Sequence, residues 1–318
     1  MTLPLLGLHH VSALSAHIGA TNRFYTRVLG MRPVIKTVNQ DDPSMYHLFF
    51  SDGAGSPGSE MTVFDMPHAA REHQGSKSIT LTTFRVCGED ALEYWADRLV
   101  VNGVAVGQPA MRDGRCVLDF ADPVGTQLSL IDDGGAGESF SWAESPVDAE
   151  RQIRGLGYIV LTVSDLAPTD RFLTEALGLQ PAHTYVLASS PRHRVHVYLI
   201  GDGGPNAEVH VIVRDDLPVA RYGSGGVHHV ALRIPDGAAM PEWVDRFNTL
   251  GYHNSGIVDR HYFTSLYVRE PNHVLFELAT DGPGFEVDGP IDPNRLSLPP
   301  FLEPRRKEIE AKLRPIEE

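Results

Sequence analysis

The chain has 318 residues, 42% of them hydrophobic and 21% charged, a composition typical of a globular protein with substantial cores. Its formal net charge of −14 argues against nucleic acids and membrane surfaces as partners, because both attract clusters of lysine and arginine. No apolar run is long enough to span a bilayer, no signal peptide is evident, and Cys87 and Cys116 form no disulfide or metal pattern, so we expect a cytoplasmic protein.

The predicted elements of the first part of the chain form two similar cycles. In the first cycle, a strand at 8–14 leads into a helical stretch that ends at Leu29-Gly30, and short strands follow at 46–50 and 61–64. The second cycle has a strand at 78–86, a helix at 90–100, and strands at 116–120 and 126–131. Each cycle is therefore a strand, a helix and several further strands, which we interpret as a βαβββ module.

The second half of the chain repeats the first at an offset of 148 residues. FYTRVLGMRP at 24–33 matches FLTEALGLQP at 172–181, and FADPVGTQLSLIDD at 120–133 matches VREPNHVLFELATD at 268–281. Several unrelated matches at one offset indicate a tandem duplication. We therefore predict an α+β fold of four βαβββ modules in two tandem halves.

The expected boundaries follow from the repeat and from the composition between its copies. Gly- and Pro-containing stretches, GGAGES and ESP, mark a linker. The predicted units are an N-terminal half at 1–133, the linker at 134–152, a C-terminal half at 153–285, and a tail with a short helix at 286–318.

Two predicted strands carry adjacent histidines, in GLHHVSA at 7–13 and GVHHVAL at 226–232. The repeat isolates His10, His229 and Glu277, because the sister modules have other residues at these positions. The aligned residues are Tyr158, Leu81 and Ser129. The module fold therefore does not demand these three, and Glu277, inside the apolar run VLFELA, is costly to bury unless it is paired or bound to a metal.

Two histidines and one carboxylate on strands form the donor set that holds Fe(II) on one face and leaves the other coordination positions open. We therefore predict that His10, His229 and Glu277 are metal ligands. For any one of them alone, a hydrogen-bonded and partly buried polar role is the alternative. Asp65 is a candidate fourth ligand, although a solvated carboxylate at a strand end is the simpler interpretation.

These residues and modules resemble the vicinal oxygen chelate superfamily of glyoxalases, bleomycin-resistance proteins and extradiol dioxygenases. The chain is most similar to ring-cleaving dioxygenases of the p-hydroquinone 1,2-dioxygenase type, through GVHHVAL and DRHYFTSLYVREPNHVLFEL at 259–278. The resemblance implies curved mixed sheets that enclose a metal site. It implies Fe(II), with Mn(II) open as an alternative, held by His10 of the first module and by His229 and Glu277 of the fourth. The first and fourth modules must then lie together.

The resemblance also implies roles for five neighbouring residues. Tyr267 is expected to transfer a proton, and Arg260 and His228 are expected to stabilise negative charge, so all three are catalytic. Ser12 and His9 are expected to bind substrate. Strict alternation along a strand, in contrast, points His9 and His228 away from the metal-side face.

The function implied is an Fe(II)-dependent dioxygenase that opens a hydroquinone or related phenolic ring with O₂, in aromatic compound catabolism. The partners expected are a small aromatic substrate and O₂, and a homo-oligomer is left open. A glyoxalase-like isomerase or lyase, with four ligands around a redox-inert ion, is one alternative, and Asp65 is the feature that favours it. A non-catalytic binding protein that confers drug resistance is the other, and the isolated triad argues against it.

Overall fold

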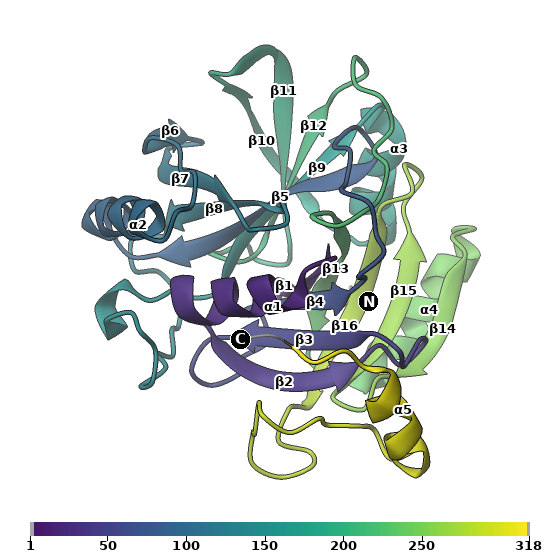
Figure 1. Ribbon diagram of the computed structural model, residues 1–318. Coiled ribbons are helices and arrows are strands. Elements are labelled where there is room, and N and C mark those ends of the chain that lie inside the picture. The colour runs from purple at the N-terminus through teal and green to yellow at the C-terminus, as the bar shows by residue number, and fades with distance from the viewer. Residues whose placement is uncertain (1–2, 317–318) are drawn as a thin grey trace.

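A computed structural model of the chain describes residues 3–316 and contains two eight-stranded mixed sheets (Figure 1). The first sequence half contains β1 Leu8–Ser15, α1 Ile18–Arg23, β2 Arg32–Val38, β3 Tyr46–Ser51 and β4 Glu60–Asp65, followed by β5 Ser78–Val86, α2 Glu89–Val101, β6 Ala110–Arg112, β7 Arg115–Ala121 and β8 Gln127–Asp132. The second half contains β9 Leu156–Val163, α3 Leu166–Arg171, β10 Gln180–Leu187, β11 Ser190–Leu199 and β12 Glu208–Val213, followed by β13 Val227–Ile234, α4 Met240–Thr249, β14 Asn254–Asp259, β15 Phe263–Arg269 and β16 Leu275–Pro283. The predicted α+β fold of four βαβββ modules is confirmed.

The sheets do not follow the two sequence halves. One sheet has the strand order β14-β15-β16-β13-β1-β4-β3-β2, so it joins the fourth module to the first. The other has the order β10-β11-β12-β9-β5-β8-β7-β6 and joins the third module to the second. Figure 1 shows the purple strands of the first module beside the yellow-green strands of the fourth. The expected pairing of the first and fourth modules is therefore confirmed.

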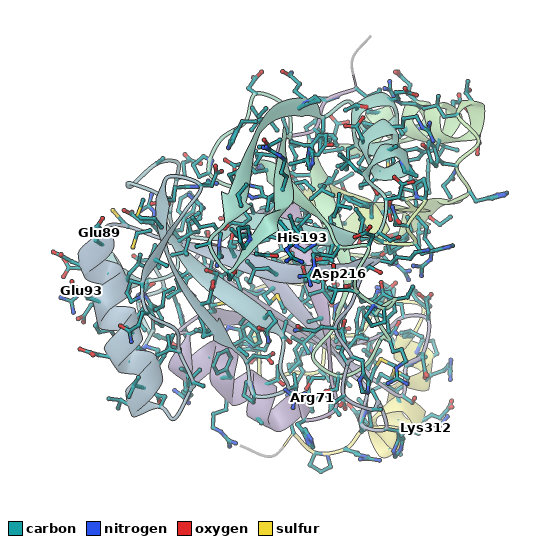
Figure 2. All side chains as sticks on the ribbon, turned by 90° about the horizontal axis from the view of Figure 1, so that it is seen from above. Arg71, Glu89, Glu93, His193, Asp216 and Lys312 are labelled. Atoms are coloured by element: carbon teal, nitrogen blue, oxygen red, sulfur yellow. The ribbon has the colours of Figure 1, made fainter. Side chains whose placement is uncertain are left out.

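Helix α2 illustrates how a helix of the modules is amphipathic. Leu92, Trp95 and Leu99 recur at helical spacing and are buried, and the helix packs on β7 and β8. Glu89 and Glu93 are exposed, and Figure 2 shows both at the outer edge of the molecule. The spacing of apolar residues thus fixes which side of the helix faces its sheet.

The central strand pair β1–β13 contains two β-bulges, one on each strand. Leu8 pairs with Leu232 and His10 pairs with Ala231, so β1 advances by two residues while β13 advances by one. His9 is therefore the extra residue of the first bulge. Across Ser12–Ala13, β13 advances by two residues, and His228 is the extra one. The β5–β9 pair of the other sheet has register shifts at the corresponding points. The bulges therefore belong to the pairing of modules and do not depend on the histidines.

The C-terminal tail covers the outer edge of the first module. Leu296 forms a bridge with Lys36 of β2, and the Tyr262 hydroxyl donates a hydrogen bond to Ser297. Further on, α5 (Arg306–Lys312) packs beside Val38 through its buried apolar side. No helix within residues 3–316 combines the length and apolarity needed to cross a membrane.

Candidate metal centre and pocket

The three predicted ligands meet at one point in the sheet of the first and fourth modules. Nε2 of His10 on β1 lies 3.2 Å from Nε2 of His229 on β13 and 3.2 Å from Oε2 of Glu277 on β16. Nε2 of His229 lies 3.0 Å from the same carboxylate oxygen. All three side chains are buried. Residues separated by up to 267 positions are thus brought together by the pairing of β1 with β13 and of β13 with β16.

This arrangement fits a bound metal ion. Three mutually perpendicular ligands about 2.1 Å from an ion lie about 3.0 Å from one another, which matches the spacing observed. Oε1 of Glu277 accepts a hydrogen bond from the Ser265 hydroxyl, whereas Oε2 is buried and has no hydrogen-bond partner within residues 3–316. A buried carboxylate oxygen beside two imidazole nitrogens is stabilised by a shared cation.

The protonation states also suit metal ligation. Burial raises the pKa of Glu277, but the electrostatic attraction of the adjacent His10 and His229 outweighs it and holds that pKa well below its ordinary value. Burial lowers the pKa of His229. An ionised carboxylate with a neutral imidazole is the state in which both can donate lone pairs to a metal.

The set has three members within the described residues 3–316, where no fourth His, Cys, Asp or Glu joins it. Asp65 lies at the end of β4, outside the group. It is buried, so the interpretation of a solvated carboxylate is wrong, and burial raises its pKa. The position equivalent to Glu277 in the first module is Thr62. Ala231, two residues after His229, lies opposite Glu277 on the neighbouring strand. Ser12, two residues after His10, lies opposite Thr62 in the same way. A hydroxyl therefore occupies the place where a fourth carboxylate would complete a four-ligand set.

A pocket of about 640 Å³ opens beside the triad and includes His10 and His229 in its wall. Its apolar lining includes Leu14, Val38, Phe49, Phe64, Phe263 and Leu275. Its polar lining includes Asp41, His47, His228, Arg260, Tyr267 and Arg269. An apolar pocket with a few convergent polar groups is typical of a site for a small organic ligand.

Arg260 and Tyr267 form one polar wall of this pocket. Nε of Arg260 donates a hydrogen bond to the Tyr267 hydroxyl at 3.2 Å, and its guanidinium carbon lies 5.2 Å from the centre of the tyrosine ring. Burial, followed by the charge of Glu277, raises the pKa of Tyr267, so the phenol is neutral. The ring of Tyr267 lies 5.9 Å from that of His229. Both residues therefore stand next to the proposed metal without joining the ligand set.

The expectation that His9 points away from the metal side is wrong, because the bulge removes strict alternation. The rings of His9 and His10 both contact Phe263, with centroids 5.3 and 5.2 Å away. Nε2 of His9 lies 3.1 Å from the carbonyl oxygen of Thr280, and its Nδ1 lies 3.0 Å from Nδ1 of His10. We therefore assign the proton of His9 to Nε2, so that its Nδ1 accepts from His10 and leaves Nε2 of His10 free for a metal.

The same correction applies to His228 on the opposite strand. Its Nδ1 lies 2.8 Å from Nδ1 of His229, and both rings contact Phe64. Burial, followed by the neighbouring His229, lowers the pKa of His228 to about 3, so this imidazole is neutral. His228 lines the pocket, whereas His9 is buried behind its wall.

Ser12 also lies behind the pocket wall, where it contacts Thr62, and His47 lines the pocket in front of them although the sequence did not indicate a role for it. The Ser12 hydroxyl lies 2.6 Å from Oγ1 of Thr62, which lies 2.8 Å from Nε2 of His47. His47 lines the pocket and stacks on Phe64 at 3.9 Å. In the sequence, His47 is marked only by lying on the same strand face as Phe49. That position indicates a place in the pocket wall only once the pairing of the first and fourth modules is known.

The equivalent region of the other sheet is filled by side chains. Tyr158, which replaces the first ligand histidine in the repeat, stacks on His210 at 3.9 Å with nearly parallel rings. Arg115 lies over the tyrosine ring at 5.1 Å and forms an ion pair with Glu208 at 2.7 Å. A guanidinium thus neutralises the carboxylate that, with His210, could otherwise attract a cation.

One further histidine cluster lies at the surface, where Figure 2 shows His193 beside Asp216. Asp216 already pairs with Arg214 through two hydrogen bonds, at 2.7 and 2.9 Å. Its charge is therefore satisfied by a cation of the chain itself.

Comparison with known proteins agrees with this architecture. The model of the Glyoxalase/Bleomycin resistance protein/Dioxygenase superfamily matches residues 7–130 and 155–278, once in each half. The chain is 44% identical, over 98% of its length and 99% of the relative, to "Putative ring-cleaving dioxygenase MhqA" of Bacillus subtilis. It is 27% identical, over 86% of its length and 84% of the relative, to the chlorohydroquinone/hydroquinone 1,2-dioxygenase of Sphingobium indicum.

Among solved structures, the crystal structure of a "putative dioxygenase" from Bacillus subtilis covers 99% of both chains, with a TM-score of 0.90 and 30% sequence identity. The two matches of the family model fall on the duplicated modules, and the relatives share nearly the whole chain. The chain therefore belongs to the glyoxalase/bleomycin resistance protein/dioxygenase superfamily.

Proposed function

We propose that this protein is an Fe(II)-dependent dioxygenase that cleaves the ring of a hydroquinone or a related phenol with O₂. The observation that carries the proposal is the set of His10, His229 and Glu277 beside an apolar pocket, with Thr62 where a fourth carboxylate ligand would stand. A glyoxalase-like site needs that fourth acid. The names of the relatives, which include ring-cleaving and hydroquinone dioxygenases, support the same reaction class.

The metal and the chain supply different parts of the chemistry. Bound Fe(II) supplies the redox capacity that lets O₂ react with an aromatic ring, which a redox-inert ion lacks. The chain supplies an apolar enclosure for the ring, in which Phe64 and Phe263 also fix the two ligand histidines. A site that holds the ring and excludes bulk water strengthens every electrostatic contact made inside it.

Tyr267 is the proposed proton-transfer residue. Its hydroxyl oxygen accepts a hydrogen bond from Nε of Arg260, which leaves the phenolic proton free to bond an oxygen of the substrate. The adjacent guanidinium stabilises negative charge on a phenolic oxygen or on reduced oxygen. His228 has its Nδ1 engaged by His229 and therefore offers the proton on Nε2 to the pocket.

His9 and Ser12 are proposed to act indirectly, because both are buried behind the pocket wall. His9 fixes the tautomer and orientation of His10 through the contact between their Nδ1 atoms. Ser12 holds Thr62, which in turn contacts His47 of the wall. Their proposed contribution is thus to the geometry of the groups that touch substrate.

The test is anaerobic loading with Fe(II), followed by measurement of O₂ uptake with a panel of hydroquinones and catechols. Mn(II)-loaded and Zn(II)-loaded protein are run in parallel, and ¹⁸O₂ reveals whether both oxygen atoms enter the product. We expect stoichiometric O₂ uptake and doubly labelled, ring-opened product with Fe(II) and none with Zn(II). Turnover without O₂, or no uptake with any member of the panel, would contradict the proposal.

A further inference from the structure

An ion pair joins the first and fourth modules at the edge of the pocket. The guanidinium of Arg260 donates two hydrogen bonds to the carboxylate of Asp41, at 2.9 and 3.2 Å. The side chain of Asp41 is 74% exposed and that of Arg260 is 19% exposed, so the contact lies at the solvent side of the pocket. A bidentate pair of this kind fixes the plane of the guanidinium as well as its position.

Asp41 belongs to the loop 39–45 between β2 and β3, which forms part of the pocket wall. The loop is closed internally by the backbone N–H of Asn39, which donates to the carbonyl of Met45 at 2.9 Å. The Gln40 side-chain amide donates to the carbonyl oxygen of Arg260 at 2.8 Å. Within residues 3–316, the side-chain hydrogen bonds from this loop to the rest of the chain all go to Arg260.

Arg260 is thus held from two sides. Its Nε bonds the Tyr267 hydroxyl, while the two terminal nitrogens bond Asp41. Because the guanidinium is planar and rigid, the carboxylate at one end sets the direction in which Nε points at the other. Removing the carboxylate would let the guanidinium rotate or turn toward solvent, and Tyr267 would lose its fixed donor.

We propose that Asp41 is a positioning residue of the reaction, which aligns Arg260 on Tyr267 and fastens the 39–45 loop to the fourth module. The expected effect of Asp41 on turnover rests on the proposed function, whereas its effect on the position of Arg260 does not. Asp41 touches neither the metal triad nor Tyr267 directly, so its effect must pass through Arg260. No repeat or motif in the sequence draws attention to this residue, because its partner lies 219 positions away.

The first measurement needs no turnover. The protein is labelled with ¹⁵N-arginine and loaded with diamagnetic Zn(II), and its Nε–H resonances are recorded by NMR. The resonance of Arg260 is assigned as the one that is missing from the spectrum of Arg260→Lys. For an ion pair with one exposed partner, we expect Asp41→Asn to speed exchange of this proton with water roughly two- to fivefold. Asp42→Asn is the matched control, because it removes the same charge from the same loop and can still accept from Ser44, its hydrogen-bond partner.

The second measurement is a double-mutant cycle on kcat/KM for hydroquinone in the Fe(II)-loaded protein. We expect Asp41→Asn to lower kcat/KM by roughly two- to tenfold, Asp41→Glu to restore part of the loss, and Asp42→Asn to have no effect. In an Arg260→Ala background, Asp41→Asn should cost nothing further. At about 1 M salt, where the Debye length is about 3 Å, the wild type should approach the Asp41→Asn variant.

The two measurements separate the two proposals. Unchanged Nε–H exchange in Asp41→Asn, or a kinetic loss that persists in the Arg260→Ala background, would overturn the positioning role. If the wild type cleaves no phenol, the proposed function fails, while the exchange rate of the Arg260 proton still decides whether Asp41 positions that side chain.

Discussion

Thr62 occupies in the first module the position that Glu277 occupies in the fourth. The relationship follows from the register of two parallel strand pairs, β1–β4 and β13–β16. Thr62 lies opposite Ser12, two residues after His10, and Glu277 lies opposite Ala231, two residues after His229. The hydroxyl of Thr62 is buried and bonded to Ser12 and His47. The difference between a three-ligand and a four-ligand centre therefore reduces to one side chain.

Thr62→Glu is expected to convert the centre to a four-ligand site. The added carboxylate would take a coordination position, so metal dissociation should slow while O₂ consumption falls by at least roughly 10²-fold, as expected when a reactant position is blocked. Chelator competition measures the first effect, and an oxygen electrode measures the second. Thr62→Val is the control, since it removes the hydroxyl without adding a ligand. Full O₂ uptake by Thr62→Glu would show that position 62 does not face the metal.

His10→Ala, His229→Ala and Glu277→Ala are each expected to lose most of the bound iron while the protein remains folded. Three ligands act together, so the loss of one removes a third of the donor set and leaves a buried polar cluster incomplete. Metal analysis after gel filtration, with circular dichroism for folding, measures the outcome. Asp65→Asn is the matched control and should keep iron near the wild-type level. Retention of iron in two of the three alanine variants would refute the assignment.

Tyr267→Phe is expected to lower kcat by at least roughly 10²-fold, because a positioned proton donor commonly contributes 10²- to 10⁴-fold in rate. The ring and its packing remain, so iron content and substrate binding should change little. Arg260→Ala, in contrast, removes a charge that acts in binding and in turnover, and both should suffer. Single-turnover ring cleavage under saturating hydroquinone and O₂ separates the two effects. A Tyr267→Phe rate within twofold of the wild type would transfer the proton-transfer role to another group, His228 first.

The metal-free protein is expected to lose stability as the pH falls below about 6.5. Burial lowers the pKa of His9 and of His228 to about 3, whereas an unfolded histidine has a pKa of about 6.5. The unfolded chain therefore binds more protons between these values, which costs about 1.4 kcal/mol per pH unit for each imidazole. Urea unfolding of chelated protein at several pH values measures the slope. His9→Asn and His228→Asn should each remove the contribution of one imidazole from the slope of unfolding free energy against pH. An unchanged slope in both variants would contradict these protonation states.

The sequence was informative wherever the duplication made one module a control for another. It isolated His10, His229 and Glu277, because Tyr158, Leu81 and Ser129 show what the module needs without a metal. It also required that the first and fourth modules pair, since a ligand set split between them has no other way to meet.

Other features depended on geometry that a periodic pattern does not contain. His9 and His228 could not be oriented by alternation, because each is the extra residue of a β-bulge and the bulge arises from how two strands pair. Asp41 reaches the site through its ion pair with Arg260 of the fourth module, and His47 lines a pocket whose wall also includes residues of the fourth module. A residue whose partner lies 219 positions away gives no local signal of its role.

The cross-pairing of modules has a consequence for the order of events during synthesis. A ribosome releases the β1 histidine early, yet its sheet partner β13 and the glutamate of β16 emerge only when most of the chain is made. The second and third modules, adjacent in sequence, can close their sheet first, while β1 of the first module has β4 on one side and still lacks β13 on the other. Contacts of such long sequence separation form slowly. The group of His10, His229 and Glu277 is therefore complete only when both ends of the polypeptide have met, and a chain truncated before β13 lacks two of its three members.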